Sequence, residues 1–207
     1  MKLYRVFRNV LAGSLCAGLA TIAYLMAATP PDSSPADAQT QTTIPLGWLE
    51  FCRNEPKDCV QQNTRLAPVH LSSKSITIIN RINRWVNSTI HPRSDKRQWG
   101  IEDLWSYPDN GEGDCEDYAL LKRRMLLEEN FPPTSLLITI VRNRKGEGHA
   151  ILMVRTDHGD FVLDNLSDEM LPWSKTDYYF IKRQSESNPN IWLKLKNAPD
   201  EEKIVTQ

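Results

Sequence analysis

A run of sixteen residues, from Cys115 to Asn130, contains no glycine, proline or β-branched side chain. Such a run favours a helix, because glycine, proline and β-branched residues weaken helices. Asp114 stands before it as a favourable N-cap, and Phe131-Pro132-Pro133 follows it as a stop signal. The chain must therefore fold around a helix that begins at or next to Cys115.

Three short apolar runs follow this helix and predict an antiparallel sheet. They cover residues 136–141, 149–156 and 160–166, and turn residues separate them. Short runs rich in β-branched residues between such turns are typical of strands. Aromatic residues between 178 and 192 predict a further strand pair. Together these elements predict an α+β fold in which the helix packs on the sheet.

Upstream, apolar residues recur at steps of three and four, which predicts an amphipathic helix with one buried face. These residues are Ile78, Ile79, Ile82, Trp85, Val86 and Ile90. We expect Trp85 to pack in the core with the others. Residues 91–114 contain prolines and glycines, and are expected to form a loop with a short helical turn.

The length and charge of the chain limit the number of domains and the class of partner. With 207 residues, of which 40% are hydrophobic, the chain can form one core but not comfortably two. Its formal net charge of -1 gives no preference for nucleic acid, and none is expected as a partner. The expected organisation is a signal peptide over 1–38, a linker over 39–45, the domain over 46–195 and a tail over 196–207.

The N-terminus has the order of a secretory signal. Basic residues between 2 and 8 precede an apolar stretch from Val10 to Ala28, and Ala36-Asp37-Ala38 has the small-x-small pattern that signal peptidase reads. An uncleaved anchor is the alternative, because about 19 apolar residues can just span a bilayer. Either version exports the domain. A lipid anchor at Cys16 is not expected, because Leu15 lies where a small residue is needed.

Cysteine usage agrees with an oxidising compartment. Cys52 and Cys59 enclose six polar residues, a loop short enough to be closed by a disulfide. A zinc pair is the alternative, but the spacing is too wide for a zinc knuckle and no second Cys/His pair lies nearby. Outside the signal, Cys115 is then the unpaired thiol. A free thiol in an oxidising compartment is a liability unless it is buried or has a function.

Three side chains supply the roles that acyl transfer by a thiol needs. Cys115 falls in the first turn of the predicted helix, where free backbone N–H groups and the helix dipole lower the pKa of a thiol. His149 begins one predicted strand and Asp164 ends the next. An imidazole can take the thiol proton, and a carboxylate can fix the imidazole tautomer. Each residue alone is common in a core or turn, but jointly they predict a catalytic triad.

The register of these two strands decides whether His149 and Asp164 can meet. A two-residue turn at His158-Gly159 would set Met153 opposite Asp164, about four residues or roughly 13 Å from His149. An earlier turn or a bulge is therefore expected. His158 is the alternative base, but it lies in the polar turn itself.

The motifs around the three residues resemble those of bacterial transglutaminase-like cysteine proteinases, exported members of the papain-like superfamily. The resemblance covers about residues 46–175, and three separated motifs carry it in the same order. They are Gly113-Asp114-Cys115-Glu116-Asp117-Tyr118-Ala119, Gly148-His149-Ala150 and Val162-Leu163-Asp164-Asn165. Upstream residues resemble the family's lead-in to its nucleophile, and these are Trp99-Gly100, Asp103 and Trp105.

The resemblance implies a papain-like or transglutaminase-like fold and a cysteine peptidase in the bacterial periplasm. Cys115 would be the nucleophile, His149 the general base and acid, and Asp164 the orienting carboxylate. That chemistry requires no cofactor. In the LapG-type branch of the family, the enzymes release large surface adhesins and need calcium near the nucleophile. A protein substrate, such as a secreted adhesin, and an inner-membrane regulator are the partners this implies.

Three carboxylates crowd Cys115 and would suit calcium, which prefers hard oxygen ligands. They belong to Asp114, Glu116 and Asp117. The alternative is that they serve only as N-cap and helix-dipole acids. Their negative charge raises the pKa of a nearby thiol, and a bound cation would relieve that effect.

Two other functions stay open. The same triad could transfer the acyl group to an amine, as a transglutaminase or amidase does. The domain could also be a non-catalytic periplasmic binding module that keeps the fold.

Overall fold

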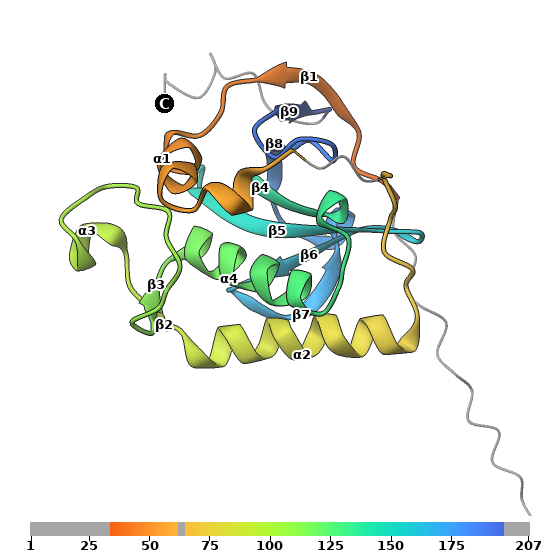
Figure 1. Cartoon of the computed structure of the whole chain (residues 1–207), viewed down its shortest axis with the longest axis horizontal. Helices are drawn as coiled ribbons and strands as arrows, with labels where there is room; N and C mark the ends of the chain where they lie inside the picture. The colour runs from red at the N-terminus through yellow and green to blue at the C-terminus, as the bar shows by residue number, and fades with distance from the viewer. Residues whose placement is uncertain (1–33, 62–64, 197–207) are drawn as a thin grey trace, which may run out of the picture.

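The computed structural model describes residues 34–61 and 65–196, in which helix α4 packs on a seven-stranded sheet (Figure 1). The strand order is β1-β9-β8-β4-β5-β6-β7, and neighbouring strands are antiparallel. Strands β4 to β7 form a meander, and the chain then crosses back to place β8 beside β4. The predicted α+β class is confirmed.

The helices are α1 (Leu46–Asn54), α2 (Ser73–Thr89), α3 (Asp95–Gln98) and α4 (Cys115–Glu128), with 3-10 turns η1 (Pro56–Cys59), η2 (Pro133–Ser135) and η3 (Trp173–Lys175). The large sheet contains β1 (Ala38–Thr42), β4 (Leu136–Arg142), β5 (Gly148–Thr156), β6 (Gly159–Asp164), β7 (Ser167–Pro172), β8 (Tyr179–Gln184) and β9 (Trp192–Leu195). A short parallel pair consists of β2 (His91–Pro92) and β3 (Glu112–Gly113). The three predicted strands correspond to β4, β5 and β6.

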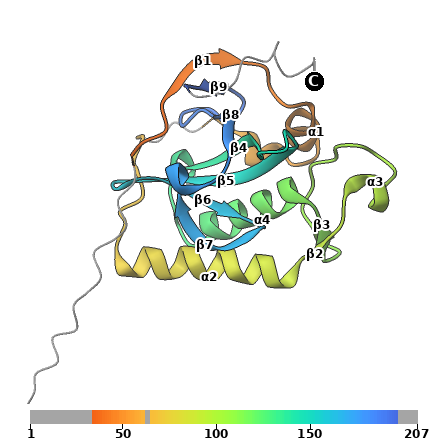
Figure 2. The same cartoon turned by 180° about the vertical axis from the view of Figure 1, so that it is seen from behind.

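Helix α4 lies between strand β5 and helix α2 in both views of the molecule (Figures 1 and 2). It begins at Cys115 after its N-cap Asp114, as predicted. Asn130 follows its end with a left-handed φ of 64°, a conformation that closes helices. The helix buries the side chains of Leu120 and Leu126. Burial of each side chain stabilises the fold by about 1.5 to 3 kcal/mol.

A second, smaller core covers the other face of the sheet, and its members include Val141, Ile151, Met153 and Phe180. Residues 34–38 pack on this face: Ala36 is only 3% exposed, and its N–H donates to Asp160 Oδ2 over 2.7 Å. Strand β1 then pairs with β9, so most of the predicted linker over 39–45 lies in a sheet strand. The sequence Ala-Gln-Thr-Gln-Thr has no apolar alternation that would have revealed it.

Helix α2 covers the outer edge of strand β7 with asparagine side chains. Asn83 and Asn87 donate to the Ser167 carbonyl oxygen at 2.9 and 3.0 Å. Asn80 Oδ1 accepts from the Met170 N–H at 3.4 Å. Steps of three and four place these amides on one helical face. Because an open strand edge invites pairing with other chains, this row of amides protects the sheet.

The prediction that Trp85 packs in the core was wrong, since its side chain is 48% exposed. The buried face of α2 runs instead through Ile79, Ile82 and Val86, and it includes Asn83. Asn83 lies in the middle of this face because its side-chain amide donates a hydrogen bond to the edge strand β7. Trp85 lies at the margin of the buried face.

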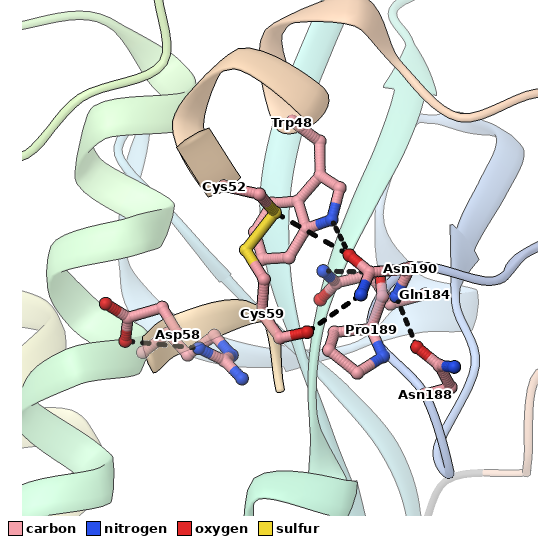
Figure 3. The surroundings of a disulfide bond; sticks show 9 residues. Trp48, Cys52, Asp58, Cys59, Gln184, Asn188, Pro189 and Asn190 are labelled. Atoms are coloured by element: carbon pink, nitrogen blue, oxygen red, sulfur yellow. Dashed lines mark hydrogen bonds and ion pairs between the residues drawn. A yellow bond between two sulfur atoms is a disulfide. The ribbon is translucent and has the colours of Figure 1, made fainter. Parts of the chain in front are cut away.

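The predicted disulfide joins Cys52 at the end of α1 to Cys59 in η1, with Cα atoms 5.7 Å apart (Figure 3). Asn190, from the loop before β9, holds this cap in place. Its Oδ1 accepts from Trp48 Nε1 at 3.0 Å, and its Nδ2 donates to the Cys59 carbonyl oxygen at 2.8 Å. Trp48 also packs edge-on against Trp105, with ring centroids 6.2 Å apart. The cap is thereby fixed over the same core as α4.

Within residues 34–61 and 65–196, no helix is both long and apolar enough to cross a membrane. The predicted apolar signal over 10–28 and most of the predicted tail lie outside these described residues.

Candidate active site

Cys115 is the first residue of α4, where the helix meets strand β5. Its Sγ lies 3.4 Å from the N–H of Ala150, the residue that follows His149. The thiol also donates to Glu116 Oε2 over 3.0 Å. Cys115 is therefore half-buried at the helix start, in contact with the strand that carries the histidine.

His149 and Asp164 form a close pair: His149 Nε2 lies 2.8 Å from Asp164 Oδ1. Both side chains are largely buried, with 10% and 7% of their surfaces exposed. Since Nε2 is engaged by the carboxylate, Nδ1 is the ring nitrogen left for proton exchange. The structure thus brings together the histidine and aspartate that the sequence predicts.

The β5–β6 turn explains how the pair meets. Thr156 pairs with Gly159, so the turn lies one residue earlier than His158-Gly159. When this register is continued along the two strands, Ile151 rather than Met153 lies opposite Asp164. His149 lies two residues further on the same face, and side chains can span the remaining gap.

Asp164 is held by more than the histidine. Tyr178 donates its hydroxyl to Asp164 Oδ2 over 2.5 Å, and the Leu166 N–H donates to Oδ1 over 3.0 Å. Burial alone would raise the pKa of this carboxyl, but the bonds from His149, Tyr178 and Leu166 lower it below its ordinary value. Asp164 is therefore kept ionised. The sequence indicated Tyr178 only as a strand aromatic, so this contact was not predicted.

The environment of Cys115 raises the pKa of its thiol well above the ordinary value, contrary to the lowering expected from the helix start. Burial is the largest cause, and the adjacent Glu116 carboxylate adds to it. The Ala150 N–H offsets only part of this effect. In the metal-free protein, burial and negative charge outweigh the helix dipole.

Three carboxylates meet beside this thiol, but they are not the three that the sequence predicted. Ligand oxygens of Asp95, Asp114 and Glu116 all lie within 4.8 Å of one another. Asp95 is fully buried and Glu116 is 6% exposed. One oxygen each of Asp95 and Asp114 is buried with no hydrogen-bond partner among the described residues. Buried, unpaired carboxylate oxygens fit a hard cation.

Asp117 has a different role from the one predicted. Its Oδ1 accepts from the Ser106 N–H at 2.9 Å, and its Oδ2 accepts from the Asp114 N–H at 3.4 Å. It therefore fixes the chain before the helix, and Asp95 of α3 takes its place in the cluster. Sequence reasoning missed Asp95 because it lies twenty residues upstream, in the predicted loop.

Burial and mutual repulsion favour the protonated forms of these acids. Burial, followed by the charge of Asp114, raises the pKa of Glu116 to about 9. Burial also raises the pKa of Asp117 to about 8, although the Ser106 N–H opposes it. The pKa of Asp95 is raised by burial as well.

Lys122 lies two turns along α4 from Cys115 and is fully buried. Its Nζ has no hydrogen-bond partner among the described residues and lies 5.9 Å from the Tyr118 ring centroid. Burial lowers the pKa of Lys122 to about 7, although Asp164 and Asp168 oppose the shift. A buried ammonium without a hydrogen bond costs stability.

The alternative base, His158, lies at the far end of β5 from His149. Its Nδ1 contacts Asp157 Oδ1 at 2.8 Å within the turn, and His70 contacts the other oxygen of Asp157 at 2.5 Å. This cluster fixes the turn to the chain before α2. The structure does not bring it to Cys115.

Comparison with protein families gives a match over residues 38–200 to the family described as bacterial transglutaminase-like cysteine proteinase. The match covers most of the chain and includes Cys115, His149 and Asp164. The chain belongs to this family. The resemblance seen in the sequence is thereby confirmed, and the protein is assigned as a cysteine peptidase.

Solved structures of LapG from Legionella pneumophila are similar to the chain. The calcium-bound form is 22% identical, with a TM-score of 0.50, and the match covers 60% of this chain and 71% of that chain. The EGTA-treated form is 23% identical, with a TM-score of 0.49, covering 56% and 66%. The likeness to the calcium-bound form supports a fold similar to that of LapG. No curated protein is significantly similar to the chain.

Proposed function

We propose that this cysteine peptidase hydrolyses a peptide bond of an exported protein with Cys115 as nucleophile, His149 as base and acid, and Asp164 as orienting carboxylate. The observation that carries the proposal is the 2.8 Å pair of His149 and Asp164 on the strands beside the Cys115 helix. Asp164 occupies Nε2 and leaves Nδ1 to exchange a proton with the thiol.

In the first step, His149 takes the thiol proton and the sulfur of Cys115 attacks the carbonyl carbon of the substrate. The C–N bond then breaks, the leaving amine takes the proton from His149, and a thioester forms on Cys115. Water next gives a proton to His149 and attacks the thioester. The carboxylic acid leaves, and the proton returns to the sulfur.

We further propose that Asp95, Asp114 and Glu116 hold calcium. When bound, calcium would supply positive charge beside the Cys115 thiol and favour its thiolate. The supporting observation is that one buried oxygen each of Asp95 and Asp114 has no hydrogen-bond partner within the described part of the chain. The calcium-bound form of the LapG structure agrees with this choice of ion.

The sequence and the disulfide support a proposal for the location and the substrate. The N-terminal signal pattern and the Cys52–Cys59 disulfide support an oxidising compartment, and we propose the bacterial periplasm. The LapG-type resemblance makes a large surface adhesin the substrate we propose to test first, with an inner-membrane protein as regulator.

Product analysis tests the reaction. The protein is incubated with candidate protein substrates in water enriched in oxygen-18, with and without a primary amine such as cadaverine. Hydrolysis puts the heavy oxygen into the new C-terminal carboxyl, whereas acyl transfer of the transglutaminase type joins the acyl group to the amine. We expect hydrolysis, lost in Cys115→Ala and His149→Ala. Products that carry the amine instead of the heavy oxygen would contradict the proposal.

A further inference from the structure

A pocket of about 420 Å³ opens beside the candidate triad, on the face of the sheet that carries the second core. Asp164 and Tyr178 line it, and these two residues are hydrogen-bonded to each other. The β4–β5 loop and the segment before β8 form other parts of its wall. The pocket is therefore continuous with the groups that hold His149.

Apolar side chains from neighbouring strands form part of this pocket. Val162 of β6 and Leu171 of β7 are paired across the sheet and both line it. Leu166, in the turn between these strands, lines it with 73% of its surface exposed. An apolar group bound here would remove the Leu166 surface from water, which favours binding.

A surface ion pair lies at the wall of the pocket. Arg144 of the β4–β5 loop contacts Asp177 of the segment before β8 at 2.5 Å. The side chains of Arg144 and Asp177 are 74% and 73% exposed. Exposed ion pairs of this kind contribute little stability, so this wall can adjust when a chain enters.

We propose that this pocket is a substrate subsite that receives an apolar side chain of the polypeptide, a few residues from the scissile bond. The inference rests on the proposed function. Asp164 lines the pocket and also contacts His149, and an extended chain advances about 3.3 Å per residue. A polypeptide whose scissile bond lies between Cys115 and His149 therefore reaches the pocket within a few residues. The volume of this pocket, about 420 Å³, lies within the range of about 300 to 1,000 Å³ that is typical of ligand-binding pockets.

Peptide cleavage by pocket variants tests the subsite. The probe is a peptide mixture from a digested bacterial proteome, with products identified by mass spectrometry in the presence of calcium. The variants are Leu166→Asp, which puts a charge at the exposed rim, and Leu171→Trp, which fills the pocket. Leu66→Asp is the matched control, because Leu66 is an exposed leucine that does not line the pocket.

Wild type is expected to select apolar residues at one fixed position relative to the cleaved bond. Changing that peptide residue to aspartate should lower kcat/KM about ten- to a hundredfold. Leu166→Asp should lose this preference, while Leu66→Asp keeps it. Alkylation of Cys115 by iodoacetamide should be unchanged in Leu66→Asp and in Leu171→Trp, which shows an intact centre. The same alkylation is measured in Leu166→Asp, to separate a lost preference from an effect on Asp164. If Leu171→Trp does not fold, Leu166→Asp at the rim still tests whether the pocket sets the apolar preference.

Two results would overturn the inference in different ways. Peptide cleavage without an apolar preference, or with a preference that survives in Leu166→Asp, would remove the subsite and leave the proposed function standing. No cleavage by wild type, together with Cys115 alkylation that is unaffected by His149→Ala, would overturn both.

Discussion

Tyr178 donates its hydroxyl to Asp164 Oδ2 over 2.5 Å, while His149 contacts the other oxygen of the same carboxylate. The tyrosine ring also lies against the imidazole, with centroids 5.5 Å apart. Tyr178 therefore acts on the histidine through the aspartate, as a positioning residue rather than a catalytic one.

Tyr178→Phe should lower kcat about tenfold, because a hydrogen bond to a charged group contributes about 1.5 kcal/mol. Without that bond the pKa of Asp164 rises, so the acidic limb of the kcat/KM profile should move to higher pH. The measurement is a pH–rate profile for the variant and for Tyr179→Phe, an exposed neighbouring tyrosine, as control. An unchanged acidic limb would show that the hydroxyl has only a structural role.

Most of the fold could be predicted, because the relevant patterns are local. The helix from Cys115 and the three strands after it follow from runs of residues with one preference. Strand β1 and the position of Trp85 could not be predicted. The first is polar and is held by its partner β9, and the second depends on which face of α2 meets the β7 edge.

The candidate site was predicted in part for the same reason. The positions of Cys115, His149 and Asp164 at element ends suggested their meeting. Asp95 of α3 and Tyr178 of the segment before β8 are distant from Cys115 in the sequence, and only tertiary packing brings them in. The raised pKa of the Cys115 thiol also depends on burial, which no local pattern reports.

The carboxylate cluster predicts a stability that depends on pH in opposite ways with and without calcium. The folded pKa of the cluster residue Glu116, about 9, lies above that of a glutamate in the unfolded chain, near 4. The folded metal-free protein therefore binds more protons between about pH 4 and 9, and its stability must fall as pH rises through that range. Calcium should reverse this trend, because it binds the ionised carboxylates.

Thermal unfolding in EGTA and in calcium, from pH 5 to 9, measures this effect. The increase in Tm that calcium causes should grow with pH in wild type and should be lost in Asp95→Asn. Asp117→Asn is the control: it should lower Tm by a similar amount in both conditions, since Asp117 only fixes the backbone. A calcium effect that survives in Asp95→Asn would contradict the proposed ligand set.

Lys122→Met should stabilise the protein by about 2 kcal/mol at pH 6, because it removes a buried ammonium that no group in residues 34–61 and 65–196 hydrogen-bonds. The folded pKa of Lys122, about 7, is lower than its unfolded value near 10.4. The cost is therefore complete below pH 7 and disappears as pH approaches 10. Denaturant unfolding of this variant and of Lys74→Met, on the exposed side of α2, checks the difference. If Lys122→Met stabilised the protein equally at every pH, the lowered pKa of Lys122 would be contradicted.

A chain that starts at Gln39 should be less stable than one that starts at Ser34, by about 2 kcal/mol. The shorter chain loses the Ala36 bond to Asp160 and the bond from Trp173 Nε1 to the Ser34 carbonyl oxygen, 2.7 Å long, and each contributes about 1 kcal/mol. Urea unfolding of the two chains measures the difference. Equal stability would show that residues 34–38 add nothing to the domain.

The most direct test of the central claim is the rate of alkylation of Cys115 by iodoacetamide from pH 4 to 9. It is measured with calcium and with EGTA, in wild type and in His149→Ala. With calcium, wild type should react well below the free-cysteine pKa near 8.5, and His149→Ala should lose this reactivity. In EGTA, the reaction should move to higher pH, because burial and Glu116 disfavour the thiolate. The same ordinary thiol profile in both proteins, with and without calcium, would contradict a Cys115–His149 catalytic pair.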